Sequence, residues 1–218
     1  MLPYIDIHTH QLQENSDIFQ LLNCIIGKEN FPNEICSVGI HPWYIDNEKE
    51  IQFELLKSTA SAENVLAIGE CGLDKITETD WYLQIEIFEK QIQLANALHK
   101  PLIIHCVRAY QEVFTILKDQ KVNVPVVFHG FNKKAELGNS ILHQGYFVSL
   151  GSSILNGIQD DFIQSVALDK IFFETDDKST NVVDIYSYFC SVRKISMSDL
   201  LEQIVKNFHN VFRYNILA

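Results

Sequence analysis

Short apolar runs alternate with helical patterns along the chain. Eight runs are rich in apolar or β-branched residues, and amphipathic stretches separate several of them. The runs are YIDIH (4–8), NCIIG (23–27), CSVGI (36–40), VLAIGE (65–70), PLIIH (101–105), VPVVFH (124–129), GYFVSL (145–150) and IFFET (171–175). Strands that alternate with helices are typical of parallel β/α units. The pattern therefore predicts eight parallel strands.

Three helices have the clearest boundary signals. The 3.6-residue spacing of apolar positions predicts a helix from Thr79 to His99, which Pro101 ends. Asn47, followed three residues later by Glu50, predicts a capping box at the start of a second helix. The pattern of residues 198–212 predicts a last helix.

Eight β/α units favour an α/β fold of the TIM type, a compact (β/α)8 barrel, although 218 residues is near the small end for it. Irregular connections near Phe31 and after Asp177 allow for some distortion. The alternative is an open doubly wound sheet, which would carry a glycine-rich phosphate loop after its first strand, and none follows DIHTH. Because no repeat or flexible linker interrupts the pattern, we expect a single domain over residues 1–218.

Composition and charge limit the partners. An apolar fraction of 47% is sufficient for a core, and no run approaches the ~18 apolar residues of a membrane helix. We expect a cytoplasmic protein with no membrane partner and no obligate protein partner. The formal net charge is -11, with 17 Lys and Arg and no basic run, which argues against wrapping of long DNA. A strand end or a small phosphorylated substrate is compatible with this charge, because bound metal ions supply local positive charge.

The first predicted strand has one polar face. Alternation places Asp6, His8 and His10 on one side and the isoleucines on the other. Three ionisable groups in a row are costly in a core unless something satisfies them. Two histidines two positions apart on a strand project the same way, so both imidazoles can bind one metal ion.

Ionisable residues also follow other predicted strands, at positions that a barrel would bring to one rim. They are His41, Glu70, His105, His129 and Asp176. Together with His8 and His10, this set exceeds what one tetrahedral ion needs, and a carboxylate can bridge two ions. The sequence therefore predicts a site for two divalent ions. Imidazole-rich ligation favours Zn, Mn, Fe or Ni, although Mg with several waters is not excluded.

Motifs along nearly the whole chain carry a family resemblance. DIHTH, GIHPW, IGECGLD, IIHCVRA, FHGF and FETD occur in order, with NFHNVF near the end. With these motifs the chain resembles the TatD-like metal-dependent hydrolases, a deoxyribonuclease family of the amidohydrolase superfamily. The resemblance implies a β/α barrel and metal-dependent hydrolysis of phosphodiesters, typically of DNA and often from the ends.

The resemblance also implies roles for single residues. It assigns His8, His10 and Asp176 to one ion, and His105 and His129 to the other. Glu70 would be shared between the ions, and Glu70 and Asp176 would be the catalytic carboxylates, with Asp176 orienting or deprotonating the attacking water.

Five residues near these ligands are candidates for other roles. Arg108 and His41 are candidate contacts for the substrate phosphate. Asp6 is a candidate for a supporting role behind the ligands, either accepting a hydrogen bond from one of them or closing the barrel floor. Asp74 is either an acceptor behind a ligand or a loop cap, and we favour the cap. Trp43 directly follows His41 and Pro42 and is a candidate for stacking on a base, although loop packing is the favoured reading.

The leading hypothesis is therefore a metal-dependent deoxyribonuclease that acts transiently on DNA ends through a two-metal site. The segments FHGFNKKAEL and ETDDKST depart from the family in substrate-facing loops, which leaves the substrate less defined than the metal ligands. The alternative is a hydrolase of a small phosphoester, ester or amide, and a non-catalytic metal-binding barrel is less favoured.

Overall fold

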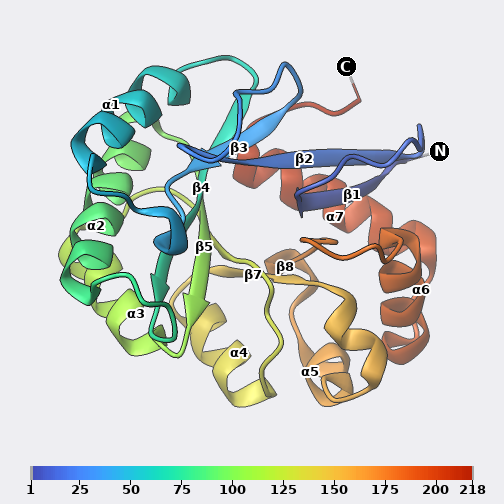
Figure 1. The fold of residues 1–218 in the computed structure, drawn as a ribbon. Coiled ribbons are helices and arrows are strands. Elements are labelled where there is room, and N and C mark those ends of the chain that lie inside the picture. Colours follow the sequence, from blue (N-terminus) through green and yellow to red (C-terminus); the bar gives the residue numbers. More distant parts are fainter. Residues whose placement is uncertain (1, 218) are drawn as a thin grey trace. The chain divides into compact units, whose positions relative to one another are not determined.

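The computed structural model describes residues 2–217 (Figure 1). Contacts divide the chain into two compact units. The first joins the chain up to Leu22 to the chain from Val127 onward, and the second runs from Asn23 to Val126. The boundaries fall inside two strands, β2 (Ile18–Ile25) and β6 (Val126–Phe128).

The first unit contains the beginning and the end of the β/α succession. Besides parts of β2 and β6, its strands are β1 (Tyr4–Thr9), β7 (Phe147–Leu150) and β8 (Ile171–Phe173). Its helices are α4 (Ala135–His143), α5 (Asp160–Ser165), α6 (Val182–Arg193) and α7 (Met197–Phe212), with the 3-10 turns η2 (Ser152–Asn156) and η3 (Leu168–Lys170). Strand β1 pairs in parallel with β2, β6 with β7, and β7 with β8.

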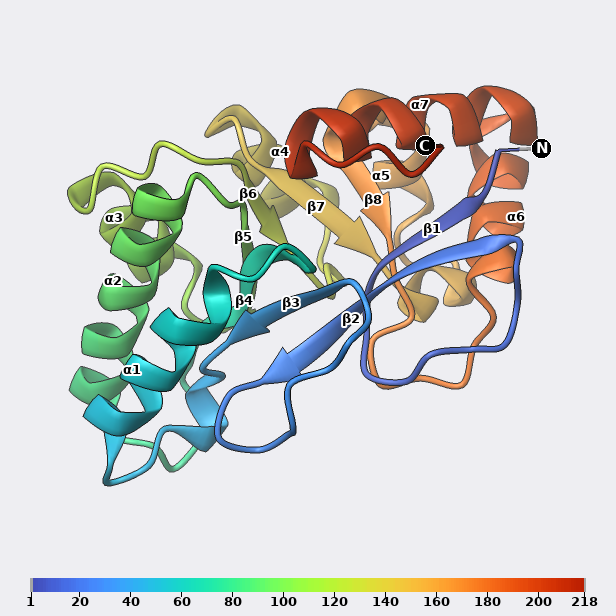
Figure 2. The same cartoon turned by 90° about the horizontal axis from the view of Figure 1, so that it is seen from above.

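Helices α6 and α7 cover β1 and β8. Figure 2 shows these two helices side by side, and both pack against both strands. The core between them contains the fully buried rings of Phe173, Tyr186 and Phe208. The Tyr186 hydroxyl donates to the carbonyl of Ile5 at 2.9 Å and accepts from its N–H at 3.1 Å. Tyr186 therefore connects α6 to β1 through the backbone N–H and carbonyl of Ile5.

The second unit contains the middle of the succession. Its strands are β3 (Cys36–Gly39), β4 (Val65–Asp74) and β5 (Leu102–Val107), with the end of β2. Its helices are α1 (Lys49–Ala60), α2 (Trp81–Leu98) and α3 (Tyr110–Asp119), with the 3-10 turn η1 (Pro42–Tyr44). Strand β4 pairs in parallel with β3 and with β5. Helices α1 and α2 lie side by side against β4 (Figure 1).

Strand order follows sequence order from β1 to β8. The end of the succession returns to its beginning within the first unit, because Thr9, the last residue of β1, forms a parallel bridge with Asp176, which follows β8. Residue 176 donates its N–H to the carbonyl of His8 at 2.9 Å and accepts at its own carbonyl from the N–H of His10 at 3.1 Å. Eight strands in this order, with the last beside the first, have the topology of a (β/α)8 barrel.

Most predicted elements are present, and several of their boundaries differ from the prediction. Helix α2 begins after Asp80, whose carboxylate accepts from the N–H of Leu83 at 3.0 Å. The predicted capping box at Asn47 is absent, because α1 begins at Lys49 with no side-chain cap. Asp46 instead accepts from the N–H of Glu48 at 2.7 Å, which forms a turn before the helix. Strand β2 begins at Ile18, earlier than the apolar run that predicted it.

Candidate metal-binding sites

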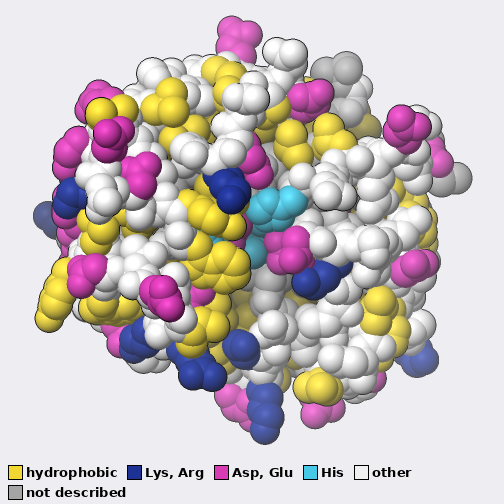
Figure 3. Space-filling view, viewed as in Figure 1, with side chains coloured by type: hydrophobic (Ala, Val, Ile, Leu, Met, Phe, Trp, Pro, Cys, Tyr) yellow, Lys and Arg dark blue, Asp and Glu magenta, His cyan; other side chains and the backbone are white. Residues whose placement is uncertain are grey.

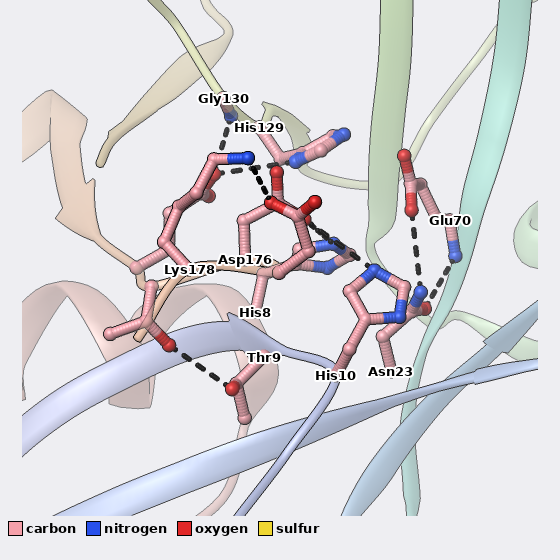
Figure 4. Close-up of polar contacts among 12 residues, drawn as sticks. His8, Thr9, His10, Asn23, Glu70, His129, Gly130, Asp176 and Lys178 are labelled. Carbon is pink, nitrogen blue, oxygen red and sulfur yellow. Dashed lines mark hydrogen bonds and ion pairs between the residues drawn. The ribbon is translucent and has the colours of Figure 1, made fainter. Parts of the chain in front are cut away.

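Four predicted ligands gather in the first unit, and we call them the His8 group. They are His8, His10, His129 and Asp176, from the ends of β1, β6 and β8. The carboxylate of Asp176 lies 3.6 Å from Nε2 of His8 and 3.4 Å from Nε2 of His10. The rings of His8 and His129 are 4.3 Å apart between centroids. Figure 4 shows the side chains of His8, His10 and Asp176 directed toward one another.

The backbone of Asp176 explains where its carboxylate lies. The residue is left-handed, with φ +57°, three positions after the end of the short strand β8. Its two backbone hydrogen bonds to the His8 and His10 segment hold this conformation. Burial raises the pKa of the carboxyl, but hydrogen bonds from His10 and His8 outweigh burial and lower the pKa well below its usual range. Asp176 is therefore a carboxylate held between two imidazoles.

A carboxylate that sequence reasoning did not select supports His129. Glu174 is fully buried, and its Oε1 lies 3.3 Å from Nδ1 of His129 and accepts from the N–H of Gly130 at 2.7 Å. When Nδ1 donates to a carboxylate, the lone pair on Nε2 is available to a metal ion. The sequence signal that could have selected Glu174 is its place two positions before Asp176 in FETD, the spacing of side chains on one face of a strand.

Asp6 lies behind the His8 group. Its carboxylate accepts from the backbone N–H of His8 at 3.3 Å and from the N–H and hydroxyl of Thr175 at 3.1 and 2.6 Å. Burial raises the pKa of Asp6 to about 7, although the bonds from Thr175 act in the opposite direction. Asp6 therefore joins β1 to the segment after β8. The predicted ligand His8 donates its backbone N–H to the Asp6 carboxylate.

Three more candidates gather in the second unit, and we call Glu70, His105 and His41 the Glu70 group. Oε1 of Glu70 lies 2.8 Å from Nδ1 of His105 and 3.2 Å from Nε2 of His41. The amide of Asn23 fixes Glu70 twice, accepting from its N–H at 3.0 Å and donating to Oε2 at 3.3 Å (Figure 4).

Close contact between β4 and β5 brings Glu70 to His105. Gly72 has φ +143°, and a Cβ at this position would lie 2.0 Å from the carbonyl oxygen of His105. No side chain fits this space, so only glycine allows the two strands to approach this closely.

Asp74 is more than the loop cap that the sequence favoured. Its Oδ1 accepts from the N–H of Ile76 at 2.8 Å, as a cap would. Its Oδ2 lies 3.0 Å from Nε2 of His105 and accepts from the indole N–H of Trp43 at 2.6 Å. Burial raises the pKa of Asp74, but hydrogen bonds from His105, Ile76 and Trp43 outweigh it and lower the pKa to about 2. The carboxylate is thus a hydrogen-bond acceptor for a predicted ligand.

The tautomer of His41 follows from its contacts. Its Nδ1 accepts from the backbone N–H of Trp43 at 3.0 Å, so the proton of the neutral ring is on Nε2. That nitrogen faces Glu70. Within this arrangement His41 is a hydrogen-bond donor through Nε2, which fits its predicted role as a substrate contact.

The donor sets suit a divalent ion. In each unit, three ligand atoms lie within 4.8 Å of one another, from His8, His129 and Asp176 in one and His41, Glu70 and His105 in the other. Two ligands on a zinc ion are at most about 4.2 Å apart, so small side-chain rotations would close either set. Imidazole and carboxylate are the usual donors for Zn, Mn and Fe.

The predicted substrate contact Arg108 is exposed directly after β5, and its φ is +55°.

The two units contain different predicted metal ligands. The His8 group contains His129, which the family resemblance had placed on the other ion. The Glu70 group pairs Glu70 with His105, as expected. How these ligands divide between ions stays a prediction.

The strand order and the donors at the strand ends are those of a metal-binding β/α barrel. Residues 8–213 match the family model described as "TatD related DNase", and the chain belongs to this family of metal-dependent hydrolases. Sequence relatives include the "Uncharacterized metal-dependent hydrolase YcfH" of Escherichia coli, 28% identical over 206 residues, which are 86% of this chain and 76% of that protein. A "Putative deoxyribonuclease TATDN1 homolog" of Enterocytozoon bieneusi is 29% identical over 182 residues, 78% of this chain and 61% of that protein.

Solved structures confirm the predicted fold class. The TatD homologue YJJV of Escherichia coli aligns with a TM-score of 0.84 at 18% identity, over 97% of this chain and 98% of that one. A TatD-family hydrolase of Entamoeba histolytica aligns with a TM-score of 0.78 at 16% identity, over 96% and 98% of the two chains. Among residues 2–217, no helix has both the length and the apolar character needed to span a bilayer.

Proposed function

We propose that this protein is a phosphodiesterase that shortens DNA from its ends with two divalent ions. The observation that carries the proposal is the pair of donor groups, each with at least one buried imidazole and a carboxylate, in a chain of a metal-dependent hydrolase family. One family match runs across both units, which supports treating residues 1–218 as a single domain.

The proposed assignment of ligands to ions follows the family resemblance. In β/α barrels the carboxyl ends of the strands form a single rim, where the active site lies. Four of the six proposed ligands are at or beyond such ends, and the other two, Glu70 and His105, lie inside β4 and β5. We propose His8, His10 and Asp176 as ligands of one ion, His105 and His129 as ligands of the other, and Glu70 as the shared carboxylate.

The remaining residues have separate tasks. Bound ions would supply a water of lowered pKa and would stabilise charge on the phosphoryl oxygens. Asp176 would orient that water or accept its proton. The guanidinium of Arg108 would bind a non-bridging phosphate oxygen pair, and Nε2–H of His41 would donate to the phosphate. Asp6, Asp74 and Glu174 would hold ligands in position.

The substrate proposal rests on the family and the charge. A relative carries the name deoxyribonuclease, and the family model is described by the same activity. Acidic and basic side chains are interspersed on the face in Figure 3, and the net charge is -11. Such a surface favours the end of a strand over a long duplex lying along a basic groove. A small phosphoester, ester or amide is the second candidate, because the loops after His129 and Asp176 depart from the family pattern.

A metal and substrate screen tests the proposal. The metal content is measured after stripping and reloading with Zn, Mn, Mg, Fe or Ni. The loaded protein is incubated with single-stranded and duplex oligonucleotides labelled at either end, and with a small phosphodiester. Glu70→Gln and Asp176→Asn remove charge at nearly constant shape, and Glu54→Gln, an exposed acid paired with Lys57, is the matched control.

We expect two ions per chain and stepwise shortening of the oligonucleotide. The Glu70 and Asp176 variants should lose more than about 100-fold in kcat/KM, and the Glu54 variant should keep the wild-type rate. Hydrolysis of the small diester alone would replace the proposal by its second candidate. Bound metal without turnover of any substrate would overturn both.

A further inference from the structure

Trp43 is an exposed aromatic residue beside the Glu70 group that is held by a side-chain hydrogen bond. It lies in η1, directly after His41 and Pro42, and 51% of the residue is exposed. Its indole N–H donates to Oδ2 of Asp74 at 2.6 Å. The polar atom of the ring is therefore satisfied, while an apolar face is left to solvent.

The indole is connected to a predicted metal ligand. The Asp74 oxygen that accepts from Trp43 also lies 3.0 Å from Nε2 of His105. The ring centroids of Trp43 and His105 are 5.9 Å apart, and those of Trp43 and His41 are 4.9 Å apart. An exposed aromatic face is thus held at a fixed position beside the Glu70 group.

The neighbouring loops add the other features of a nucleic-acid contact. Ile76, which is 60% exposed, donates its N–H to the second oxygen of Asp74. The N–H of Lys75 donates to the carbonyl of Val107 at 3.1 Å, so this loop adjoins the exposed Arg108. Proteins that bind single strands combine cationic side chains with aromatic faces on which bases stack.

We propose that the exposed face of Trp43 stacks on an unpaired nucleobase of the substrate. The proposal rests on the proposed nuclease function and narrows its substrate to single strands and frayed ends, because a base inside a duplex is already stacked. Stacking on an indole is tolerant of sequence, since every base has an aromatic face. Asp74 then positions the base and His105 together.

A binding measurement tests this without turnover. The chain has 2 tryptophans, so Trp81→Phe makes Trp43 the only indole. The metal-stripped variant is titrated with a short oligothymidylate and with an abasic oligomer of the same length and charge. We expect quenching of Trp43 fluorescence by the oligothymidylate and at least about fivefold weaker binding of the abasic oligomer. Equal binding and equal quenching would overturn the proposal.

Steady-state kinetics with the metal-loaded enzyme provides the second test. Trp43→Leu should raise the KM for a single-stranded oligonucleotide about tenfold, with little change in kcat, and Trp43→Phe should lie between it and the wild type. Phe31→Leu is the control, because Phe31 is 45% exposed but precedes β3 and so lies at the opposite ends of the strands. An unchanged KM in Trp43→Leu would reject stacking. If the wild type cleaves no oligonucleotide, the nuclease proposal fails, and the fluorescence titration still decides whether Trp43 binds bases.

Discussion

Glu174 accepts a hydrogen bond from His129 inside the first unit, with Oε1 and Nδ1 3.3 Å apart and the carboxylate fully buried. The same oxygen holds the N–H of Gly130, so one buried atom sets both the ring and the backbone that follows it. This contact fixes the direction of Nε2, the nitrogen proposed to bind metal.

Replacing Glu174 should weaken metal binding by the His8 group. Glu174→Leu removes the acceptor, and we expect the affinity for Zn or Mn to fall by about 10- to 100-fold, as for other residues that orient ligating histidines. Glu174→Gln keeps an oxygen at the Oε1 position and should lose less. Calorimetric titration of metal-stripped protein measures both, and wild-type affinity in the leucine variant would contradict the orienting role.

Asp74 should act in the same way on the Glu70 group. Asp74→Ala removes the partner of His105 Nε2 and of the Trp43 indole, so metal affinity should fall by about 10-fold or more. Asp80→Ala is the matched control: it removes the cap of α2 and should cost about 1 kcal/mol of stability without changing metal affinity. Metal titration and urea unfolding of both variants separate the two effects. Equal metal affinity in the two variants would show that Asp74 is only a loop cap.

The left-handed backbone of Asp176 predicts a difference between two substitutions. Asparagine tolerates φ +57° and alanine does not, so Asp176→Ala should be less stable than Asp176→Asn by about 1 kcal/mol. Both should be inactive. Urea unfolding of the metal-free variants measures the difference in the free energy of unfolding. Equal stability would mean that the backbone of residue 176 relaxes when the carboxylate is lost.

Gly72 should be intolerant of any side chain. In Gly72→Ala the new Cβ would meet the carbonyl of His105, and we expect a loss of at least about 2 kcal/mol in the free energy of unfolding. Gly151→Ala is the control, because its φ is -104° and the Cβ would stand 3.7 Å from Glu174. That variant should stay within about 0.5 kcal/mol of the wild type. Similar losses in both would remove the argument that glycine is needed for the approach of β4 and β5.

Apolar runs predicted the strands because most of them are buried on both faces. Strand β2 was predicted to begin at Asn23, five residues too late, because Gln20 interrupts the apolar pattern before it. Both side chains are satisfied by partners distant in sequence: Gln20 bonds the backbone of Gln13, and Asn23 bonds Glu70 and Ser37. The capping box failed because Asp46 competes with Asn47 for the turn before α1. The contact between Asn23 and Glu70 joins residues 47 positions apart, so local sequence carries no signal for it.

The candidate ligands were predictable because they occupy the same position on successive strands. The residues that support them were not, because a carboxylate near a strand end has no local signal that names its partner. Asp74 reads as a cap and is one, yet its other oxygen faces His105. Glu174 lies two positions before Asp176, which was the residue selected as a ligand in this segment. Its role depends on a contact with His129, 45 residues away in the sequence.

The bridge between Thr9 and Asp176 has a consequence for biosynthesis. Asp176 is made 168 residues after His8, so a ribosome has completed most of the chain before the carboxylate can reach its imidazoles. If the His8 group binds metal as proposed, the growing polypeptide carries His8 and His10 without their third ligand. Acquisition of metal by this group would then be a late event of translation.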